Sequence, residues 1–167
     1  MATVRTMAAA LGVVGIAWLA GCDMTVDKVD LPKPEGWDKA PAGDARVKYV
    51  SPAEGADDDF REYVEVAGAM PPGRTSKVSE LAYNDLHKRK RRLDDMKIES
   101  EEEVRIAGKA CRKVVYTHKD SGRRLKVQAY YFLFHATGMV LTGTATDKSY
   151  DRFAPRFERI ANTLKFR

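Results

Sequence analysis

The stretch Val127-Gln128-Ala129-Tyr130-Tyr131-Phe132-Leu133-Phe134 decides the fold of this 167-residue chain. One set of alternate side chains is Val127, Ala129, Tyr131 and Leu133, and the other includes Tyr130, Phe132 and Phe134. Successive side chains of a strand point to opposite faces of the sheet, so this strand is apolar on both faces. Such a strand needs cover on both sides, which predicts a sheet sandwiched between two layers.

The second half of the chain predicts a meander of antiparallel strands around this stretch. Strands are expected over residues 97–106, 110–118, 123–135 and 139–146. Their connections are short and carry the turn residues Gly108, Asp120-Ser121-Gly122 and Gly138, which favour hairpins. Two shorter strands are expected earlier, over residues 46–50 and 60–66.

Two helices are predicted as the covering layers. One spans residues 76–96, with Ser76 as its cap. The other carries a single apolar face formed by Phe153, Phe157, Ile160, Ala161 and Leu164. Because Pro155 would clash inside an established helix, regular geometry is expected to begin near it. The predicted fold class is therefore α+β, an antiparallel β-sheet covered by helices on both faces (an α/β/α sandwich).

The amino terminus has the outline of a secretory signal. Residues 1–6 carry one charge, Arg5, and an apolar run follows from Met7 to Ala20. That run is shorter than the roughly 20 residues that a membrane-spanning helix needs. The segment is therefore predicted to be removed after export and not to span a membrane.

The run Leu19-Ala20-Gly21-Cys22 resembles the lipobox of bacterial lipoproteins. Small residues let the extended chain enter a peptidase cleft, and the Cys22 thiol is the nucleophile that accepts a diacylglyceryl group. Two or three acyl chains hold a protein stably on a membrane. Cleavage before Cys22 and lipidation of Cys22 are therefore predicted, the alternative being an ordinary signal cleaved near Ala20. Asp23 resembles the inner-membrane retention signal of enteric bacteria, with the outer membrane as the alternative location.

The chain divides into three predicted segments: a signal peptide over residues 1–21, a lipidated cysteine with a spacer over 22–44, and a single domain over 45–167. The spacer carries Pro32, Pro34 and Pro41, and its Trp37 is expected to pack onto the domain. Removal of the signal takes away Arg5 and lowers the formal net charge from +5 to +4.

Cys111 becomes the only free thiol of the mature chain once Cys22 is a thioether, so no disulfide is predicted. It lies in a strand-like run and is expected to be a small buried apolar residue.

A run of five cations, Lys88, Arg89, Lys90, Arg91 and Arg92, ends the first predicted helix. Successive helical residues advance by about 100°, so the five surround the helix, and Arg89 is expected to lay its stem along the core. The run is interpreted either as a solvated helix end paired with Glu99, Glu101, Glu102 and Glu103, or as a surface that binds an anionic lipid or glycan. Nucleic acid is not an expected partner, because no aromatic residues are interleaved with the cations.

Catalytic and metal-binding motifs are absent from the sequence. His87, His118 and His135 are far apart, and H-E-x-x-H, G-x-S-x-G, S-x-x-K and P-loop patterns do not occur. The run Asp57-Asp58-Asp59 lacks the ligand spacing of an EF-hand and is predicted to be a solvated turn. No cofactor, metal or enzyme activity is predicted, and a hydrolase is the least favoured alternative.

The order of elements resembles the PsbP and DcrB group of α/β/α sandwich proteins. The resemblance covers most of residues 34–167 and is carried by Pro34-Glu35-Gly36-Trp37, by residues 104–116 with the Gly108 turn, by residues 130–146, and by residues 153–166. It implies a non-enzymatic accessory protein, since members include photosystem assembly subunits, a binder of the Ran GTPase and envelope lipoproteins. No binding residue of the group is carried over. The predicted function is a membrane-anchored binding or scaffolding module for an unidentified envelope protein partner.

Overall fold

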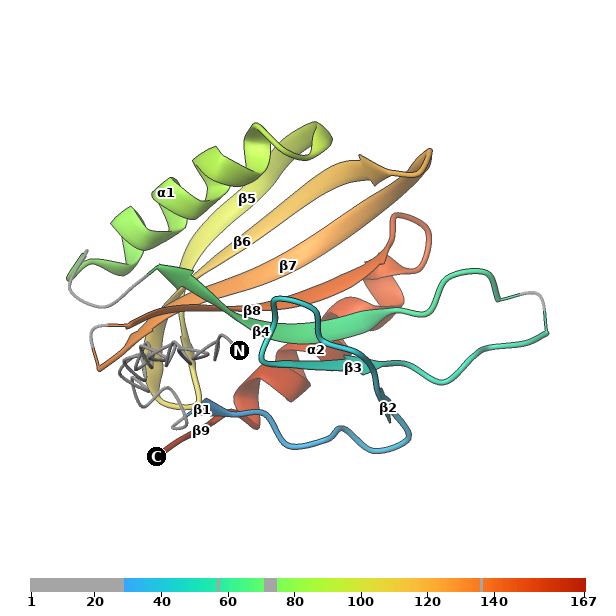
Figure 1. Ribbon diagram of the computed structural model, residues 1–167, viewed down its shortest axis with the longest axis horizontal. Coiled ribbons are helices and arrows are strands. Elements are labelled where there is room, and N and C mark those ends of the chain that lie inside the picture. Colours follow the sequence, from blue (N-terminus) through green and yellow to red (C-terminus); the bar gives the residue numbers. More distant parts are fainter. Residues whose placement is uncertain (1–28, 57, 71–74, 136) are drawn as a thin grey trace, which may run out of the picture.

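A mostly antiparallel sheet with two helices makes up the protein (Figure 1). The computed structural model describes residues 29–56, 58–70, 75–135 and 137–167. Within those ranges, seven strands form one sheet in the order β2-β3-β4-β8-β7-β6-β5. Their bounds are β2 Asp38–Lys39, β3 Val47–Val50, β4 Tyr63–Met70, β5 Asp94–Ile106, β6 Lys109–Asp120, β7 Arg123–Phe134 and β8 Thr137–Thr146. The helices are α1, Val78–Lys90, and α2, Tyr150–Asn162, and a separate pair of strands is β1, Val29–Asp30, with β9, Lys165–Phe166.

The predicted meander is confirmed for β5 to β8, which pair as successive antiparallel neighbours. Two of its turns have two residues with positive φ, Ala107-Gly108 (48° and 77°) and Ser121-Gly122 (50° and 80°). Such turns match the twist of a hairpin, and glycine adopts these angles without strain. The turn predicted at Gly138 is wrong, because Gly138 lies inside β8 opposite Leu133.

β4 starts three residues later than predicted, at Tyr63 instead of residue 60. It pairs with β3 on one side and β8 on the other, and Val66 lies opposite both Val47 and Leu141. Its extension to Met70 follows from this pairing with β8, which continues past Val66.

The side chains of β7 alternate between two apolar clusters, which explains why both of its faces are apolar. Tyr130 and Phe132 belong to the cluster that contains the apolar face of α2. Val127, Ala129 and Tyr131 belong to the cluster that contains Leu81, Ala82 and Leu86 of α1. All five of these β7 side chains are buried, so the packing is close on both faces of the strand.

α1 is shorter than predicted, because it ends at Lys90 and not at residue 96. After Leu86, residues 87–92 offer no apolar side chain, so this stretch gives a longer helix nothing to bury before Leu93. The chain turns at Arg91 and Arg92, and Met96 reaches the core from β5 instead. Ser76 is not the cap, since the capping position is Lys77, which makes no side-chain capping bond.

α2 is longer than predicted, because it begins at Tyr150 and includes Pro155. The missing N–H of Pro155 leaves only the carbonyl of Asp151, in the first turn, without its helical donor. Both residues are exposed, so water can satisfy that carbonyl. The extra turn buries Tyr150 and Phe153, which favours the longer helix.

The part of the predicted spacer from Val29 onward lies against the domain. β1 pairs with β9 and β2 pairs with β3, so both short strands are held by backbone hydrogen bonds (Figure 1). Leu31 and Trp37 are buried in the α2 cluster. The Trp37 ring meets Phe153 edge-on, with centroids 6.4 Å apart, so the prediction that Trp37 packs onto the domain is confirmed.

Gly143→Ala should destabilise the protein strongly. A Cβ at this position would lie 2.3 Å from Cγ of the buried Phe157 ring, so β8 and α2 would have to move apart. Overpacking of this kind costs about 1–3 kcal/mol, which urea unfolding followed by Trp37 fluorescence would measure. Gly68→Ala is the matched control, because a Cβ there meets nothing within 4 Å. Equal unfolding midpoints for the two variants would contradict the packing described for Gly143.

Candidate functional site

A polar pocket of about 510 Å³ lies beyond the carboxyl end of α1. Small-molecule sites in proteins commonly have volumes of roughly 300–1,000 Å³. The walls come from β4, β6, β8 and the segment that follows α1. We call this the α1-end pocket, and the polar side chains that line it include Tyr63, Glu65, Arg89, Arg92, Tyr116, His118, Thr142 and Thr144.

The register of the sheet brings these side chains together. Tyr63 lies opposite Thr144, Thr144 lies opposite Val127, and Val127 lies opposite Tyr116, so one row crosses β4, β8, β7 and β6. Glu65 and Thr142 face each other in the next row. Directly opposed residues of neighbouring strands share a face, so these polar side chains form one floor.

An ion pair between α1 and the sheet forms the wall nearest the core. Nε of Arg89 lies 2.6 Å from Oδ2 of Asp85, and Tyr131 donates its hydroxyl to the same oxygen at 2.9 Å. Nη1 of Arg89 donates to the hydroxyl of Tyr116 at 3.3 Å. The Arg89 and Asp85 side chains are only 27% and 13% exposed, so the prediction that Arg89 lays its stem along the core is confirmed.

Protonation in this network is fixed across the physiological range. Burial raises the pKa of Tyr116 to about 12, although Arg89 partly offsets that effect. Burial and the charge of Asp85 raise the pKa of Tyr131 even further. Burial lowers the pKa of Arg89, but Tyr116, Tyr131 and Asp85 outweigh it and leave the pKa above its ordinary value. The tyrosines therefore remain donors and Arg89 remains charged, which suits a rigid wall better than a pH switch.

The prediction that the acidic residues of β5 pair with the end of α1 is wrong. Glu99 pairs with Lys126, Glu102 with Lys113, and both Glu101 and Glu103 with Arg112. Cross-strand neighbours set the choice, since Glu102 lies directly opposite Lys113 and Glu103 opposite Arg112 in the β5–β6 register.

The five cations at the end of α1 therefore have different surroundings. Arg89 pairs with Asp85, whereas Lys88, Lys90, Arg91 and Arg92 are exposed and make no ion pair with any residue that the structure describes. Arg92 lines the α1-end pocket. The sequence could not show this division, because it depends on which cations of β6 and β7 lie close enough to pair with the acidic residues of β5.

A second hollow, of about 390 Å³, lies between α1 and β5. We call it the α1 groove, and its lining includes Tyr83, Leu86, His87, Lys90 and Ile98. Tyr83 is 69% exposed and Ile98 is 45% exposed, and they are the exposed large hydrophobic residues of the described part of the chain. The rings of Tyr83 and His87 stack with centroids 6.3 Å apart. An apolar floor thus lies beside Lys90, a cation that pairs with no acid of the described residues.

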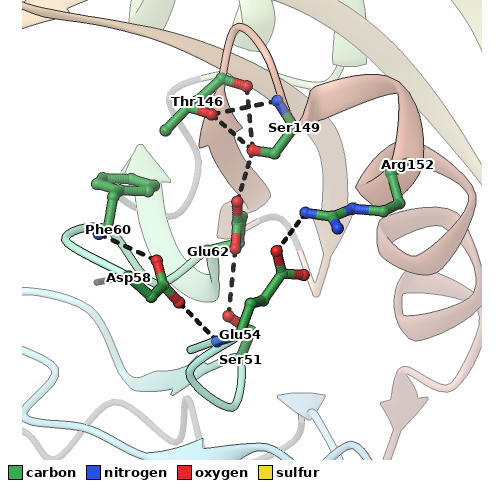
Figure 2. A network of polar contacts seen from close by, with 8 residues as sticks. All are labelled: Ser51, Glu54, Asp58, Phe60, Glu62, Thr146, Ser149 and Arg152. Carbon is green, nitrogen blue, oxygen red and sulfur yellow. Dashed lines mark hydrogen bonds and ion pairs between the residues drawn. The ribbon is translucent and has the colours of Figure 1, made fainter. Parts of the chain in front are cut away.

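A separate polar cluster connects the amino end of α2 to the loop between β3 and β4 (Figure 2). The buried carboxylate of Glu62 accepts a hydrogen bond from Ser149 Oγ at 2.5 Å and another from Ser51 Oγ at 3.3 Å. Figure 2 also shows Arg152 of α2 reaching Glu54 on the outside of the loop. These contacts connect α2 to the loop between β3 and β4.

No family model matches the chain, and no curated protein matches it in sequence. Solved structures do match. LpqN of Mycobacterium tuberculosis, described as involved in cell envelope biogenesis, is 13% identical, with 82% of each chain covered and a TM-score of 0.61.

Two further structures agree with that match. The cyanobacterial PsbP protein (CyanoP) of Synechocystis is 14% identical over 95% of this chain and 98% of its own, with a TM-score of 0.58. PA94 of Pseudomonas aeruginosa, a protein of unknown function, is 17% identical over 87% and 88%, with a TM-score of 0.56. The chain has a PsbP-like fold. At these identities the likeness concerns the fold alone.

The histidines of this PsbP-like fold do not converge. His87 stacks on Tyr83 at the surface, His118 is buried on β6, and His135 packs on Phe134 at the end of β7. Across the described ranges, no group of three histidine, cysteine or acidic side chains could hold a metal ion. Cys111 is buried, as predicted, and burial raises the pKa of its thiol to about 11. At neutral pH it is therefore an unreactive thiol.

Part of the acidic run lies in a turn, where Asp58 accepts hydrogen bonds from the amides of Glu54 and Phe60. Asp57 lies outside the described residues. Cys22 and the lipobox lie outside the described residues. No described helix is both long and apolar enough to cross a bilayer.

The pocket floor was missed in the sequence. Its available signal was the alternation of Thr142, Thr144 and Thr146 in a strand whose other residues are apolar or small. Such a polar stripe on a central strand marks a face that apolar packing does not fill.

Asp85→Asn should lower the free energy of unfolding by about 2 kcal/mol, because it leaves the half-buried Arg89 without its counter-charge. The measurement is the midpoint of urea unfolding. Asp38→Asn is the control, since its ion pair with Arg61 is on the surface, where Asp38 is 64% exposed, and such pairs contribute at most about 1 kcal/mol. A larger loss for Asp38→Asn than for Asp85→Asn would refute the structural role given to Asp85.

Proposed function

We propose that this protein is a membrane-anchored, non-catalytic accessory module of the bacterial cell envelope, which holds a protein partner through its α1 side. The observation that carries the proposal is the α1 groove, where exposed Tyr83 and Ile98 lie beside Lys90, a cation that no described acid neutralises. The PsbP-like fold and the envelope role stated for LpqN support it.

The anchor of this proposal is a lipid on Cys22, after removal of residues 1–21. Its support is the Leu19-Ala20-Gly21-Cys22 run, which resembles a lipobox. Six residues lie between Cys22 and Val29, the start of β1, so seven Cα–Cα steps join them. At about 3.5 Å for each extended residue, the domain stays within about 25 Å of the membrane surface. Asp23 favours the periplasmic face of the inner membrane over the outer membrane.

We further infer that the domain is a full α/β/α sandwich, with α1 and α2 on opposite faces of the sheet. Alternate side chains of β7 enter the α1 cluster and the α2 cluster, and alternate side chains of a strand point in opposite directions. Val29 of β1 packs with the α2 cluster. The chain from the anchor therefore joins the domain at the α2 layer, and the α1 groove lies at the opposite layer.

The chemistry of the α1 groove selects an acidic protein segment that carries an apolar side chain. An apolar centre with a charged rim is the usual composition of a protein interface. Leu86, Tyr83 and Ile98 supply the apolar centre, and Lys90 supplies the unpaired charge at the rim. The other charged residues of the lining, Glu101 and Arg112, pair with each other. Unpaired cations also steer an acidic partner toward the groove.

Recognition of an anionic lipid or glycan by Lys88, Arg89, Lys90, Arg91 and Arg92 is the alternative function. The lack of ion-pair partners for four of these five residues within the described ranges favours it. Arg89 is already engaged by Asp85, which leaves the alternative with four cations that do not form one flat face.

Cys22→Ser should release the protein from membranes, because a serine cannot accept the thioether-linked diacylglyceryl group. Fractionation of cells and mass spectrometry of the amino-terminal peptide would measure this. Cys111→Ser is the matched control and should stay membrane-bound. Retention of Cys22→Ser in the membrane fraction, or a mature chain that starts at another residue, would overturn the anchor.

A photo-crosslinking amino acid at Tyr83 should capture a discrete protein adduct in intact cells, because this exposed ring lies in the proposed groove. The same amino acid at Arg156, an exposed residue of α2, is the positional control. Ile98→Asp and Lys90→Glu, each combined with the probe at Tyr83, should reduce the adduct about tenfold, the loss expected for a central interface residue.

Two results would contradict the groove proposal. One is an adduct at Tyr83 no stronger than that at Arg156. The other is binding of the protein to phosphatidylglycerol vesicles that falls with salt and with Lys90→Glu, in the absence of a protein adduct. The second result would support the anionic-lipid alternative instead.

A further inference from the structure

The floor of the α1-end pocket is polar where packing alone calls for apolar side chains. β8 is the central strand of the seven-stranded sheet formed by the described residues, and its α1-side residues run Val140, Thr142, Thr144. Thr142 is 3% exposed. A buried hydroxyl without a partner is unfavourable, so a valine of the same shape would be the better packing residue.

The hydroxyl of Thr142 opens into the pocket. It has no hydrogen-bond partner among the described residues, and yet no fully buried side-chain oxygen or nitrogen there lacks a partner. Its remaining neighbour is therefore the space of the pocket, which Thr142 lines. The same space is lined by the carboxylate of Glu65, directly across from Thr142 on β4.

The charges that line the pocket do not favour an anion. Arg89 is neutralised by Asp85 at 2.6 Å, and Lys119 is paired with Asp95 at 3.6 Å. Among the described residues, the lining groups left without an ion pair are one cation, Arg92, and three acids, Glu65, Asp94 and Asp120. A phosphate or an acidic headgroup would face more negative than positive charge.

A hydrophobic ligand fits the lining poorly. Leu93 and Val127 are its apolar side chains, too few for such a ligand. His118 is held by a backbone contact, because its Nδ1 lies 3.2 Å from the carbonyl oxygen of Lys119. A carbonyl only accepts, so Nδ1 is the donor of that hydrogen bond.

We propose that the α1-end pocket binds a neutral, hydroxyl-rich ligand of monosaccharide size. Sugar hydroxyls both donate and accept at adjacent positions, and the lining supplies both kinds of partner. Glu65 accepts, Arg92 donates, and the hydroxyls of Thr142 and Tyr63 do either. The ligand is either a free sugar or one unit of a glycan, and the pocket volume of about 510 Å³ admits a sugar ring with its bridging waters.

The test is equilibrium binding to the full lipidated protein in a detergent without a sugar headgroup. Saturation-transfer NMR and calorimetry would use D-glucose, D-galactose, D-mannose and N-acetyl-D-glucosamine, with maltotriose and chitotriose to distinguish a glycan unit from a free sugar. Inorganic phosphate and D-glucose 6-phosphate are the anionic comparators. At least one neutral sugar should bind, with an affinity that does not change with salt.

Glu65→Gln and Thr142→Val should each weaken that sugar about tenfold or more, the effect of losing one hydrogen bond in a binding site. Lys88→Gln is the control, because Lys88 is exposed and does not line the pocket. Thr142→Val should also leave the unfolding midpoint equal or higher, since it replaces a polar group with an apolar one of the same shape. A merely structural Thr142 would lower that midpoint instead.

Three outcomes would overturn the proposal. The first is that none of the neutral sugars binds. The second is that only phosphate or D-glucose 6-phosphate binds, with an affinity that falls as salt rises. The third is sugar binding that survives both Glu65→Gln and Thr142→Val. If Thr142→Val lowers the unfolding midpoint, Glu65→Gln alone decides the outcome.

Discussion

β7 has β8 on one side and β6 on the other, and its alternate side chains fill two separate apolar clusters. Neither set can be left in water, since each contains large apolar groups whose burial contributes about 25 cal/mol for every Å². α1 and α2 must therefore both dock on the meander. The position of Trp37 and of β1 follows from the same constraint, because they complete the cluster around α2.

The length of α1 decides where polar chemistry is possible on its side of the sheet. The helix has apolar side chains to bury as far as Leu86, and it ends at Lys90 within the run of cations. β4, β6 and β8 continue past that point, and their side chains there form the floor of the α1-end pocket. One stretch of sequence thus ends the apolar cover and supplies Arg89 and Arg92 to the pocket wall.

Ion pairs within the sheet decide which cations on the α1 side have an acidic partner and which do not. The acidic residues of β5 pair with cations of the adjacent strand β6 and with Lys126 of β7, the next strand beyond it. Lys88, Lys90, Arg91 and Arg92 are consequently left to solvent or to a partner, and Lys90 lines the apolar α1 groove. A groove with a cationic rim and a pocket with an excess of acids are different surfaces, so a protein partner and a small polar ligand need not compete.

The sequence by itself determined the strands of the meander, the existence of both helices, the burial of Trp37 and Cys111, and the inward stem of Arg89. These follow from side-chain period and local turn chemistry, which neighbouring residues encode. Tertiary structure alone decided three features. α1 ends at Lys90, the acidic residues of β5 form ion pairs with cations of β6 and β7, and Glu65 lies opposite Thr142. Each of these depends on register between distant segments, and a one-residue shift in register would turn every side chain to the other face.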